Sequence, residues 1–157
     1  VPERMPRTRT SRTVQFRLVG EVAPGWAVRG EYRYFWDTWD IAAHTFGIGA
    51  STRFGERWLV DAYARGYRQD GALFYSDNAT SETLYVTRNR QLSNYNSWTI
   101  GTKATYALKR EPGRYEIFLN GAVEFWMTDY SDFTDVRTGS LYSYNATVLQ
   151  VYVTALF

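Results

Sequence analysis

The sequence predicts an all-β protein built from about seven antiparallel strands. In one segment after another, apolar residues alternate with other residues at a period of two, and Tyr, Trp, Val and Thr dominate these segments. No stretch repeats apolar residues at spacings of three and four, so we expect no helix. Aromatic residues make up 18% of the chain, with 13 Tyr, 9 Phe and 6 Trp, which is high for a soluble domain and favours strands.

The last segment, residues 145–157, shows the alternation clearly and serves as the reference for the others. Val151, Val153 and Phe157 share one face of the expected strand, which is long enough to cross a bilayer as a tilted strand of roughly 9–11 residues. Because it ends on Phe157, the segment resembles the C-terminal strand of bacterial outer-membrane β-barrel proteins. In those proteins the final strand serves as an assembly signal, and the resemblance implies that role for Val151, Val153 and Phe157.

The first two expected strands follow a basic opening. Residues 1–12 contain several arginines and show no alternation, whereas apolar residues alternate with Gln, Arg and Glu from Thr13 to Val22. A tight turn at Pro24-Gly25 separates this strand from the second, residues 26–36. The second strand has Trp, Val and Tyr on one face and Arg and Glu on the other, so its two faces meet different surroundings.

The third and fourth expected strands are joined by another tight turn. Residues 41–54 and residues 58–69 both alternate, and Gly55-Glu56-Arg57 lies between them. A long polar loop, residues 70–94, follows the fourth strand. The chain therefore has a short connection on one side of the pair and a long one on the other.

The fifth and sixth expected strands repeat this arrangement. Residues 95–108 and residues 115–127 alternate, with a turn at Pro112-Gly113 between them. A second long loop, residues 128–144, leads to the last strand. Short and mostly longer connections thus alternate along the chain.

This alternation predicts an antiparallel up-and-down transmembrane β-barrel, because such barrels have short periplasmic turns and longer external loops. Bacterial single-chain barrels have even strand numbers, so seven strands predict the C-terminal part of a larger barrel. Residues 13–157 would form this part, and residues 1–12 would be a basic external loop or the start of a fragment. An eighth strand within residues 1–12 is the alternative, which its two prolines oppose.

Aromatic residues gather toward both ends of the expected strands, as they do at the two interfaces of membrane barrels. The predicted interface residues are Trp26, Trp36, Trp58, Trp98, Tyr106 and Tyr115.

The composition excludes several classes of function. The chain has no Cys, which excludes disulfides, Cys metal sites and thiol catalysis. A formal net charge of +2 is too small to argue for nucleic acid. The opening residues contain no apolar region typical of a signal peptide, so an outer-membrane protein would be present here as a mature form or a fragment.

Four runs of the sequence resemble a known family in their order and spacing. They are YRYFWDTWDIAAHTFGIG, FGERWLVDAYARGYRQDGALFYSDN, VTRNRQLSNYNSWTIGTKATY and SDFTDVRTGSLYSYNATVLQVYVTALF. From about Gly30 to Phe157 the chain is similar to the C-terminal portion of domain-of-unknown-function family 3570, a family of predicted outer-membrane proteins of Gram-negative bacteria. The resemblance implies location in the cell outer membrane, contact with lipid and lipopolysaccharide, and insertion by the barrel-assembly machinery. It implies no catalytic residues.

The strand residues that point away from the expected lipid side include most of the charged residues. These residues are expected to face the lumen. They can form a charged pore lining that sorts solutes, or cross-strand ion pairs that fill the lumen, and a wide barrel allows both. Asn120 also lies on the expected lumen side, so we expect it to tolerate Arg. Arg at Val123 or Val151, on the lipid face, should destabilise the protein by about 2–4 kcal/mol. The predicted lumen residues are Arg17, Glu21, Arg29, Glu31, Arg33, Arg53, Asp61, Arg65, Lys103, Glu116 and Glu124.

We therefore expect a porin-like channel for small polar or charged solutes. The alternative is a non-conducting barrel scaffold that anchors or encloses a partner protein. An enzyme is not expected, because the single histidine, His44, shares the parity of Phe46 and Ile48 and no triad is evident. No cofactor is expected.

One acidic loop is a weak calcium candidate. Asp129, Asp132 and Asp135 recur at a spacing of three, but the run lacks the glycine hinge and terminal Glu of an EF-hand loop. An ordinary solvated loop explains the same residues. Residues 75–78 resemble this run, and we hypothesise that the two loops meet over the barrel mouth and together supply ligands.

Overall fold

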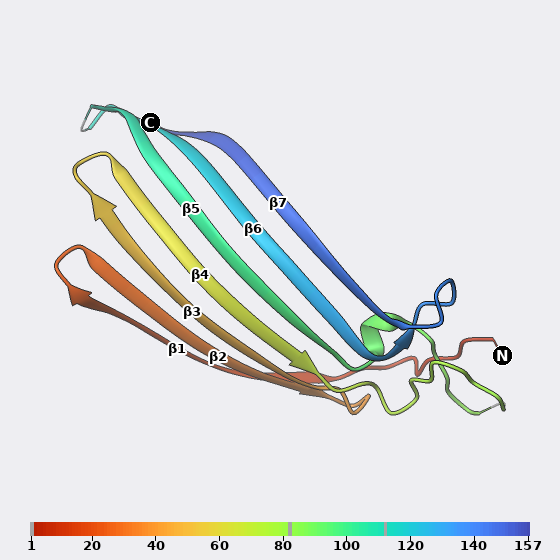
Figure 1. Ribbon diagram of the computed structural model, residues 1–157. Coiled ribbons are helices and arrows are strands. Elements are labelled where there is room, and N and C mark those ends of the chain that lie inside the picture. Colours follow the sequence, from red (N-terminus) through yellow and green to blue (C-terminus); the bar gives the residue numbers. More distant parts are fainter. Residues whose placement is uncertain (1, 82, 112) are drawn as a thin grey trace.

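The computed structural model describes residues 2–81, 83–111 and 113–157. In these residues the chain forms seven strands and one short 3-10 helix, η1, which spans Arg90–Leu92 (Figure 1). The strands are β1 (Ser11–Ala23), β2 (Trp26–Asp37), β3 (Ala42–Phe54), β4 (Trp58–Gln69), β5 (Tyr95–Glu111), β6 (Tyr115–Thr134) and β7 (Leu141–Leu156).

All seven strands belong to one antiparallel sheet in chain order, from β1 at one edge to β7 at the other. Each strand pairs with the next, which confirms the predicted all-β, antiparallel fold. The sheet is open, and its long strands twist and curve together (Figure 1). The turns β1–β2, β3–β4 and β5–β6 gather at one end with the C-terminus, and the remaining connections gather at the other end with the N-terminal segment.

Glycines make the tight turns at the first of these ends. Gly25, Gly55 and Gly113 all have positive φ, between 60° and 78°, a left-handed conformation that glycine adopts without steric strain. The predicted turns at Pro24-Gly25 and Gly55-Glu56-Arg57 are confirmed. Of the predicted turn Pro112-Gly113, Pro112 lies outside the described residues.

Three expectations about the connections were wrong. β5 continues to Glu111 through an irregularity between Ala107 and Lys109, whereas the sequence predicted that this strand ends at residue 108. β6 continues to Thr134 and β7 begins at Leu141, so residues 135–140 form a short turn in place of the predicted long loop. Asp and Ser are uncommon in strands, which hid this extension from the sequence pattern.

The third wrong expectation concerns helix. Within the loop between β4 and β5, η1 is short, and Asn89 caps it by accepting a hydrogen bond from the backbone N–H of Gln91 at 3.0 Å. A single turn leaves no repeated spacing in the sequence. Of the residues that the structure describes, none belongs to a helix that is long and apolar enough to cross a membrane.

The only buried apolar cluster among the described residues lies at the loop end. Ile41, Ala72 and Leu92 form it, and partly buried aromatic residues pack against it, among them Trp39 and Phe74. It fixes the loop between β4 and β5 against the end of the sheet. Most large apolar side chains of the sheet itself are exposed.

Candidate functional site on the polar face

The strand register divides the sheet into two unlike faces, because directly paired residues of an antiparallel ladder point to the same side. Pairs such as Arg17 with Glu31 and Asp61 with Lys103 join the charged residues of successive strands. Every predicted lumen residue falls on this one side, which we call the polar face. It carries Arg17, Glu21, Arg29, Glu31, Arg33, Arg53, Asp61, Arg65, Lys103, Glu116 and Glu124.

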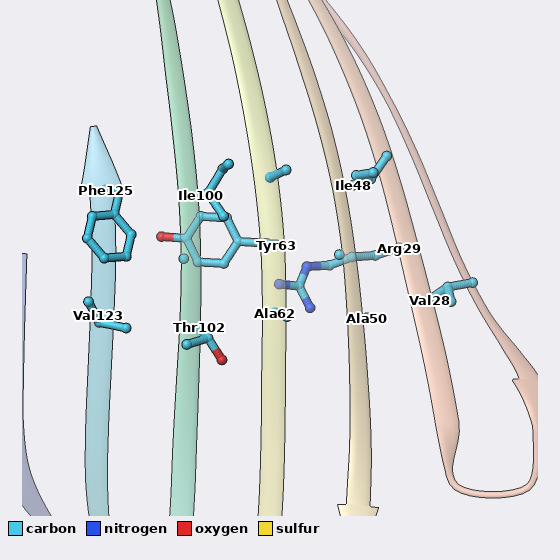
Figure 2. Close-up of a pocket in the computed structure, with 13 residues that line it drawn as sticks. Val28, Arg29, Ile48, Ala50, Ala62, Tyr63, Ile100, Thr102, Val123 and Phe125 are labelled. Carbon is cyan, nitrogen blue, oxygen red and sulfur yellow. The ribbon is translucent and has the colours of Figure 1, made fainter. Parts of the chain in front are cut away.

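The opposite side, which we call the apolar face, exposes large hydrophobic side chains. Val151 is 80% exposed and Leu149 is 76% exposed. A shallow hollow over the small residues Ala50 and Ala62 is bordered by longer apolar side chains of β3, β5 and β6 (Figure 2). Further exposed members of the apolar face are Phe16, Leu18, Phe46, Ile48, Trp98, Ile100, Phe125 and Val153.

The predicted interface aromatics all lie on the apolar face. At the turn end, the Trp58 and Tyr106 rings are 4.7 Å apart between centroids, and Trp26 packs edge-on against Phe54 at 6.5 Å. At the loop end, Trp36 stacks on Tyr34 at 5.3 Å. The other two are Trp98 on β5 and Tyr115 at the start of β6.

The centre of the polar face is an ion pair that spans three strands. Arg29 of β2 donates to both carboxylate oxygens of Asp61 of β4, at 2.6 and 2.8 Å. Between them, Ser51 of β3 donates to Asp61 and accepts from Arg29 at 3.3 Å. This two-point geometry is the strong form of an Arg–carboxylate pair.

Glycines make room for the long side chains of this face. A Cβ at Gly49 would lie 2.6 Å from the guanidinium carbon of Arg29, and one at Gly101 would lie 2.6 Å from the Tyr63 ring. Figure 2 shows Arg29 reaching over β3 and Tyr63 reaching over β5. Gly47 has the same relation to Glu31. Only glycine allows these side chains to lie flat along the sheet.

The other carboxylates of the polar face are also engaged. Glu31 accepts from Arg17 at 3.1 Å, and Glu21 accepts from the backbone N–H of Gly25 at 3.0 Å. Glu116 lies 4.0 Å from Arg110, and Glu124 accepts from the Trp126 indole at 2.9 Å. Glu31, Asp61 and Glu116 therefore form ion pairs with arginines of other strands.

Several cations of the polar face have no ion-pair partner among the described residues. Within the described part of the chain, Arg33, Arg53 and Arg65 have neither an ion-pair partner nor a side-chain hydrogen bond. Lys103 lies 5.4 Å from the centroid of the Tyr152 ring, within cation–π range. Of the eleven charged residues named on the polar face, six are cations and five are carboxylates, so the excess of positive charge is small.

A row of tyrosines crosses the polar face at its loop end. Tyr67, Tyr95 and Tyr130, on β4, β5 and β6, have ring centroids 5.4 and 5.2 Å apart. Tyr142 and Tyr144 of β7 extend the row, with Tyr130 and Tyr142 at 5.5 Å. We call these five residues the tyrosine row. The tyrosine row is not evident from the sequence, because Tyr130 and Tyr142 lie in residues 128–144, for which the sequence predicts a loop.

The calcium candidates do not come together as one site. Asp132 accepts from the backbone and side chain of Asn94, whereas Asp135 accepts from the backbone and guanidinium of Arg137. Asp129 lies within β6, opposite Ser143. In residues 2–81, 83–111 and 113–157, no group of three or more His, Cys, Asp or Glu side chains is arranged to hold a metal ion.

Residues 75–78 nevertheless contact the acidic run at the end of β6, although the two segments supply no shared metal site within the described residues. The Tyr75 hydroxyl donates to the Asp132 carbonyl at 3.0 Å, and the Thr134 N–H donates to the Asp77 carboxylate at 3.1 Å. Arg88 joins them further, pairing with Asp77 at 3.0 Å and donating to the Thr134 carbonyl. We call residues 70–81 and 83–94 together with their contacts at the end of β6 the cap.

The segment before β1 lies against the cap. Arg4 and Val86 exchange two backbone hydrogen bonds, at 2.9 and 2.8 Å, and Glu3 accepts from the backbone N–H of Arg88 at 2.8 Å. The Trp39 indole donates to the Thr8 carbonyl at 3.0 Å. The loop end of the sheet is therefore an ordered assembly of segments far apart in the chain.

His44 lies on the apolar face, on the same side as Phe46 and Ile48, as the alternation in the sequence predicted. Its Nδ1 is 2.8 Å from the Tyr32 hydroxyl, and its ring packs against Tyr34 with centroids 4.9 Å apart. These aromatic neighbours account for the histidine as a packing residue at the loop end of the sheet.

These features define a class of protein, an all-β chain with one open antiparallel sheet, a polar face and an apolar face. The chain matches, over residues 1–133, the family model described as "Protein of unknown function (DUF3570)", and it belongs to that family. The match includes β1, which lies before the residues that carried the resemblance, and it stops within β6. No curated protein and no solved structure matches the chain.

Proposed function

We propose that the chain forms part of the wall of an outer-membrane β-barrel in a Gram-negative bacterium, with the apolar face toward lipid. The observation that carries this proposal is the contrast between the two faces of one long sheet. Side chains such as Val151 and Leu149 are exposed on one face, and ion-paired or hydrogen-bonded residues occupy the other. In water so large an exposed apolar face would be an aggregation surface, whereas lipid solvates it.

The strand lengths support the proposal. β3 and β4 contain 13 and 12 residues. At about 3.3 Å per residue and a tilt near 45°, such strands rise roughly 30 Å, close to the thickness of the hydrocarbon core of a bilayer. The longer β6 would extend beyond the membrane into the cap.

The sheet edges need partners in a membrane. Unpaired N–H and C=O groups are too unfavourable in hydrocarbon, so sheets cross membranes only as closed barrels. We propose that further strands pair with β1 and β7 and close the barrel to an even number. The barrel-assembly machinery would recognise the end of β7 through Val151, Val153 and Phe157, and the cap would face lipopolysaccharide outside the cell.

We propose further that the polar face lines a passive channel for small polar or charged solutes. The surplus cations Arg33, Arg53 and Arg65 support this role, because a lumen that served only for packing would pair its charges. The proposal assigns the chain no catalytic role and no cofactor.

Single-channel recording of the full-length protein in a planar bilayer tests this function. We expect discrete conductance steps that protein-free bilayers and heat-denatured protein do not give. Protein that inserts into the bilayer, shown by protease protection of the strands, but carries no current at any voltage would contradict the channel.

A non-conducting scaffold is the second candidate, and the ordered cap favours it. The cap and the Arg29–Asp61 pair place side chains over the polar face and its outer end. A scaffold would insert without conductance and would be recovered from the membrane with a partner protein after chemical cross-linking. Conductance with no cross-linked partner excludes it.

A further inference from the structure

The loop between β4 and β5 folds back onto the polar face at the loop end of the sheet. Gln69 of β4 lies on this face, two residues after Tyr67, and only 7% of it is exposed. Its side-chain amide donates to the carbonyl groups of Gln91 and Ser93, at 2.9 and 3.1 Å, and its side-chain oxygen accepts from the Tyr67 hydroxyl at 2.7 Å. The backbone of η1 is therefore held on the polar side of the sheet.

The apolar cluster at this end lies on the same side. Leu92 of η1 is buried in it, and Phe35 of β2, which packs against it, shares the polar face with its cross-strand partner Ala43. Ala43 is 2% exposed. On the opposite face, Arg68 of β4 is exposed. The loop thus covers the polar side of this end of the sheet, which is the lumen side in the proposed channel.

η1 carries an exposed arginine to the tyrosine row. The guanidinium carbon of Arg90 lies 5.4 Å from the centroid of the Tyr142 ring, within cation–π range. The Ser93 hydroxyl donates to the Arg90 carbonyl at 2.7 Å and so holds the turn of η1 closed. Since Gln69 belongs to β4 and Tyr142 to β7, the segment reaches across the polar side of the two strands between them.

Arg90 has no ion-pair partner in the part of the chain that the structure describes. Asp77 pairs with Arg88, and Asp132 accepts from Asn94, so these two carboxylates of the loop end are engaged elsewhere. A fixed cation beside a low-dielectric wall raises the local concentration of anions. The charge of η1 therefore favours anions at this level of the proposed lumen.

We propose that η1 is the constriction, the narrowest part, of the proposed channel and that Arg90 makes the channel prefer small anions. Gln69 is the positioning residue that holds η1 inward. Arg90 is the selectivity residue, because charged side chains at the narrowest part of a pore act on every ion that passes. The constriction rests on the proposed channel and defines its solute class, small anions such as chloride and phosphate.

The first experiment measures the reversal potential of the full-length protein in a planar bilayer with a potassium chloride gradient. The parent should prefer chloride. Arg90→Glu should lower the ratio of chloride to potassium permeability by about threefold or more at low ionic strength, because the reversed charge acts on the ion at close range. Arg90→Lys retains the charge and should retain the preference, whereas a loss as large as that of Arg90→Glu would overturn the proposal.

Arg114→Glu is the matched control. Arg114 lies in the turn between β5 and β6, at the opposite end of the sheet, and its side chain is 80% exposed. The same charge reversal there should change the permeability ratio less than about 1.5-fold, because salt screens an exposed charge far from the constriction. Equal shifts for Arg90→Glu and Arg114→Glu would overturn the proposal, as would a parent that prefers potassium.

The second experiment releases η1 without changing a charge. Gln69→Met removes both hydrogen bonds to the segment, so it should speed hydrogen exchange of the backbone amides of residues 91–93 about tenfold or more and raise the conductance. Gln150→Met makes the same change at an exposed position of the polar face on β7 and should alter neither. Faster exchange without higher conductance would overturn the constriction, and unchanged exchange would overturn the role of Gln69. Arg90→Glu decides the proposal if Gln69→Met loses the β-sheet circular dichroism of the parent.

Conductance separates the failure of the constriction from the failure of the channel on which it rests. A parent protein that inserts but carries no current at any voltage contradicts the channel, and the constriction with it. A conducting parent whose reversal potential is unchanged in Arg90→Glu retains the channel and overturns only the constriction.

Discussion

The two faces of the sheet use the same backbone in opposite ways. On the apolar face, large side chains such as Leu149 and Val151 stand exposed with no polar contact. On the polar face, long charged side chains lie flat across neighbouring strands, and Gly49 and Gly101 leave room for them. The difference shows that alternation alone does not build the polar face. The polar face also requires glycine, which has no side chain, at positions such as Gly49 and Gly101.

The largest expected effect comes from placing a charged residue on the apolar face of a strand. Val151→Arg places a charge on the apolar face of β7 and should destabilise the protein in lipid by about 2–4 kcal/mol. Gln150→Arg places the same charge one residue away, on the polar face, and should change stability much less. Urea unfolding of both variants in lipid vesicles measures the difference. Equal losses of stability would contradict the orientation that we propose.

Asn120 shows how far the sequence alone predicts the polar face. Its side chain lies on the predicted face, but it is 3% exposed, so we expect Arg at this position to destabilise the protein more than the sequence pattern indicated. Its side chain accepts from Thr105 at 2.8 Å and donates to Thr154 at 3.0 Å. Alternation determines the side to which a residue points, whereas burial depends on partners brought by neighbouring strands. For this reason Gln150 replaces Asn120 as the control.

The strands were largely predictable, and the loop end was not. β4 has the predicted bounds, and the other strands begin or end within a few residues of the prediction except at β5, β6 and β7. Those extensions, η1 and the cap depend on contacts between segments far apart in the chain, such as Tyr75 with Asp132. Periodicity records only the local surroundings of a segment. The tyrosine row was missed for the same reason.

The second prediction removes the central pair of the polar face. Asp61→Ala leaves Arg29 without its carboxylate and should destabilise the protein by about 1–2 kcal/mol. The value lies below that of a buried pair because the two side chains are 40% and 26% exposed. The double variant Arg29→Met/Asp61→Leu should recover much of this loss in urea unfolding. A double variant less stable than Asp61→Ala would indicate that the pair itself stabilises the fold strongly.

The third prediction tests directly whether the polar face requires glycine. Gly49→Ala puts a Cβ against the Arg29 guanidinium and should destabilise the protein by about 1 kcal/mol, since Arg29 must move away from Asp61. Gly30→Ala, on the apolar face, meets no atom within 4 Å and should stabilise the protein by about 0.4–1 kcal/mol, because it restricts the unfolded chain. Opposite signs in urea unfolding are expected. The same sign for both would remove the distinction that we draw between the faces.

The smallest effect concerns an Asp–Arg pair in the cap, outside the sheet. Burial raises the pKa of Asp77, but hydrogen bonds from Thr134 and the charge of Arg88 outweigh it and hold the pKa below the ordinary value of 3.8. Because the pKa is lowered in the folded cap, the ionised carboxylate stabilises the cap when the pH is above the ordinary pKa of Asp. This stabilisation is lost as the pH falls through the lowered pKa. Hydrogen exchange of the backbone amides of residues 74–81 should therefore be steady from neutral pH to about pH 4 and rise below it, after correction for intrinsic rates.

Two substitutions decide whether Asp77 causes this loss of protection. Asp77→Asn should loosen the cap at neutral pH and remove the change below about pH 4. Asp135→Asn is the matched control, because hydrogen bonds from Arg137 also hold the pKa of Asp135 low, yet that pair closes only the turn between β6 and β7. It should leave exchange at residues 74–81 unchanged. If both variants loosen the cap equally, its order depends on the summed charge of the loops, and the contrast between a specific pair and a solvated one disappears.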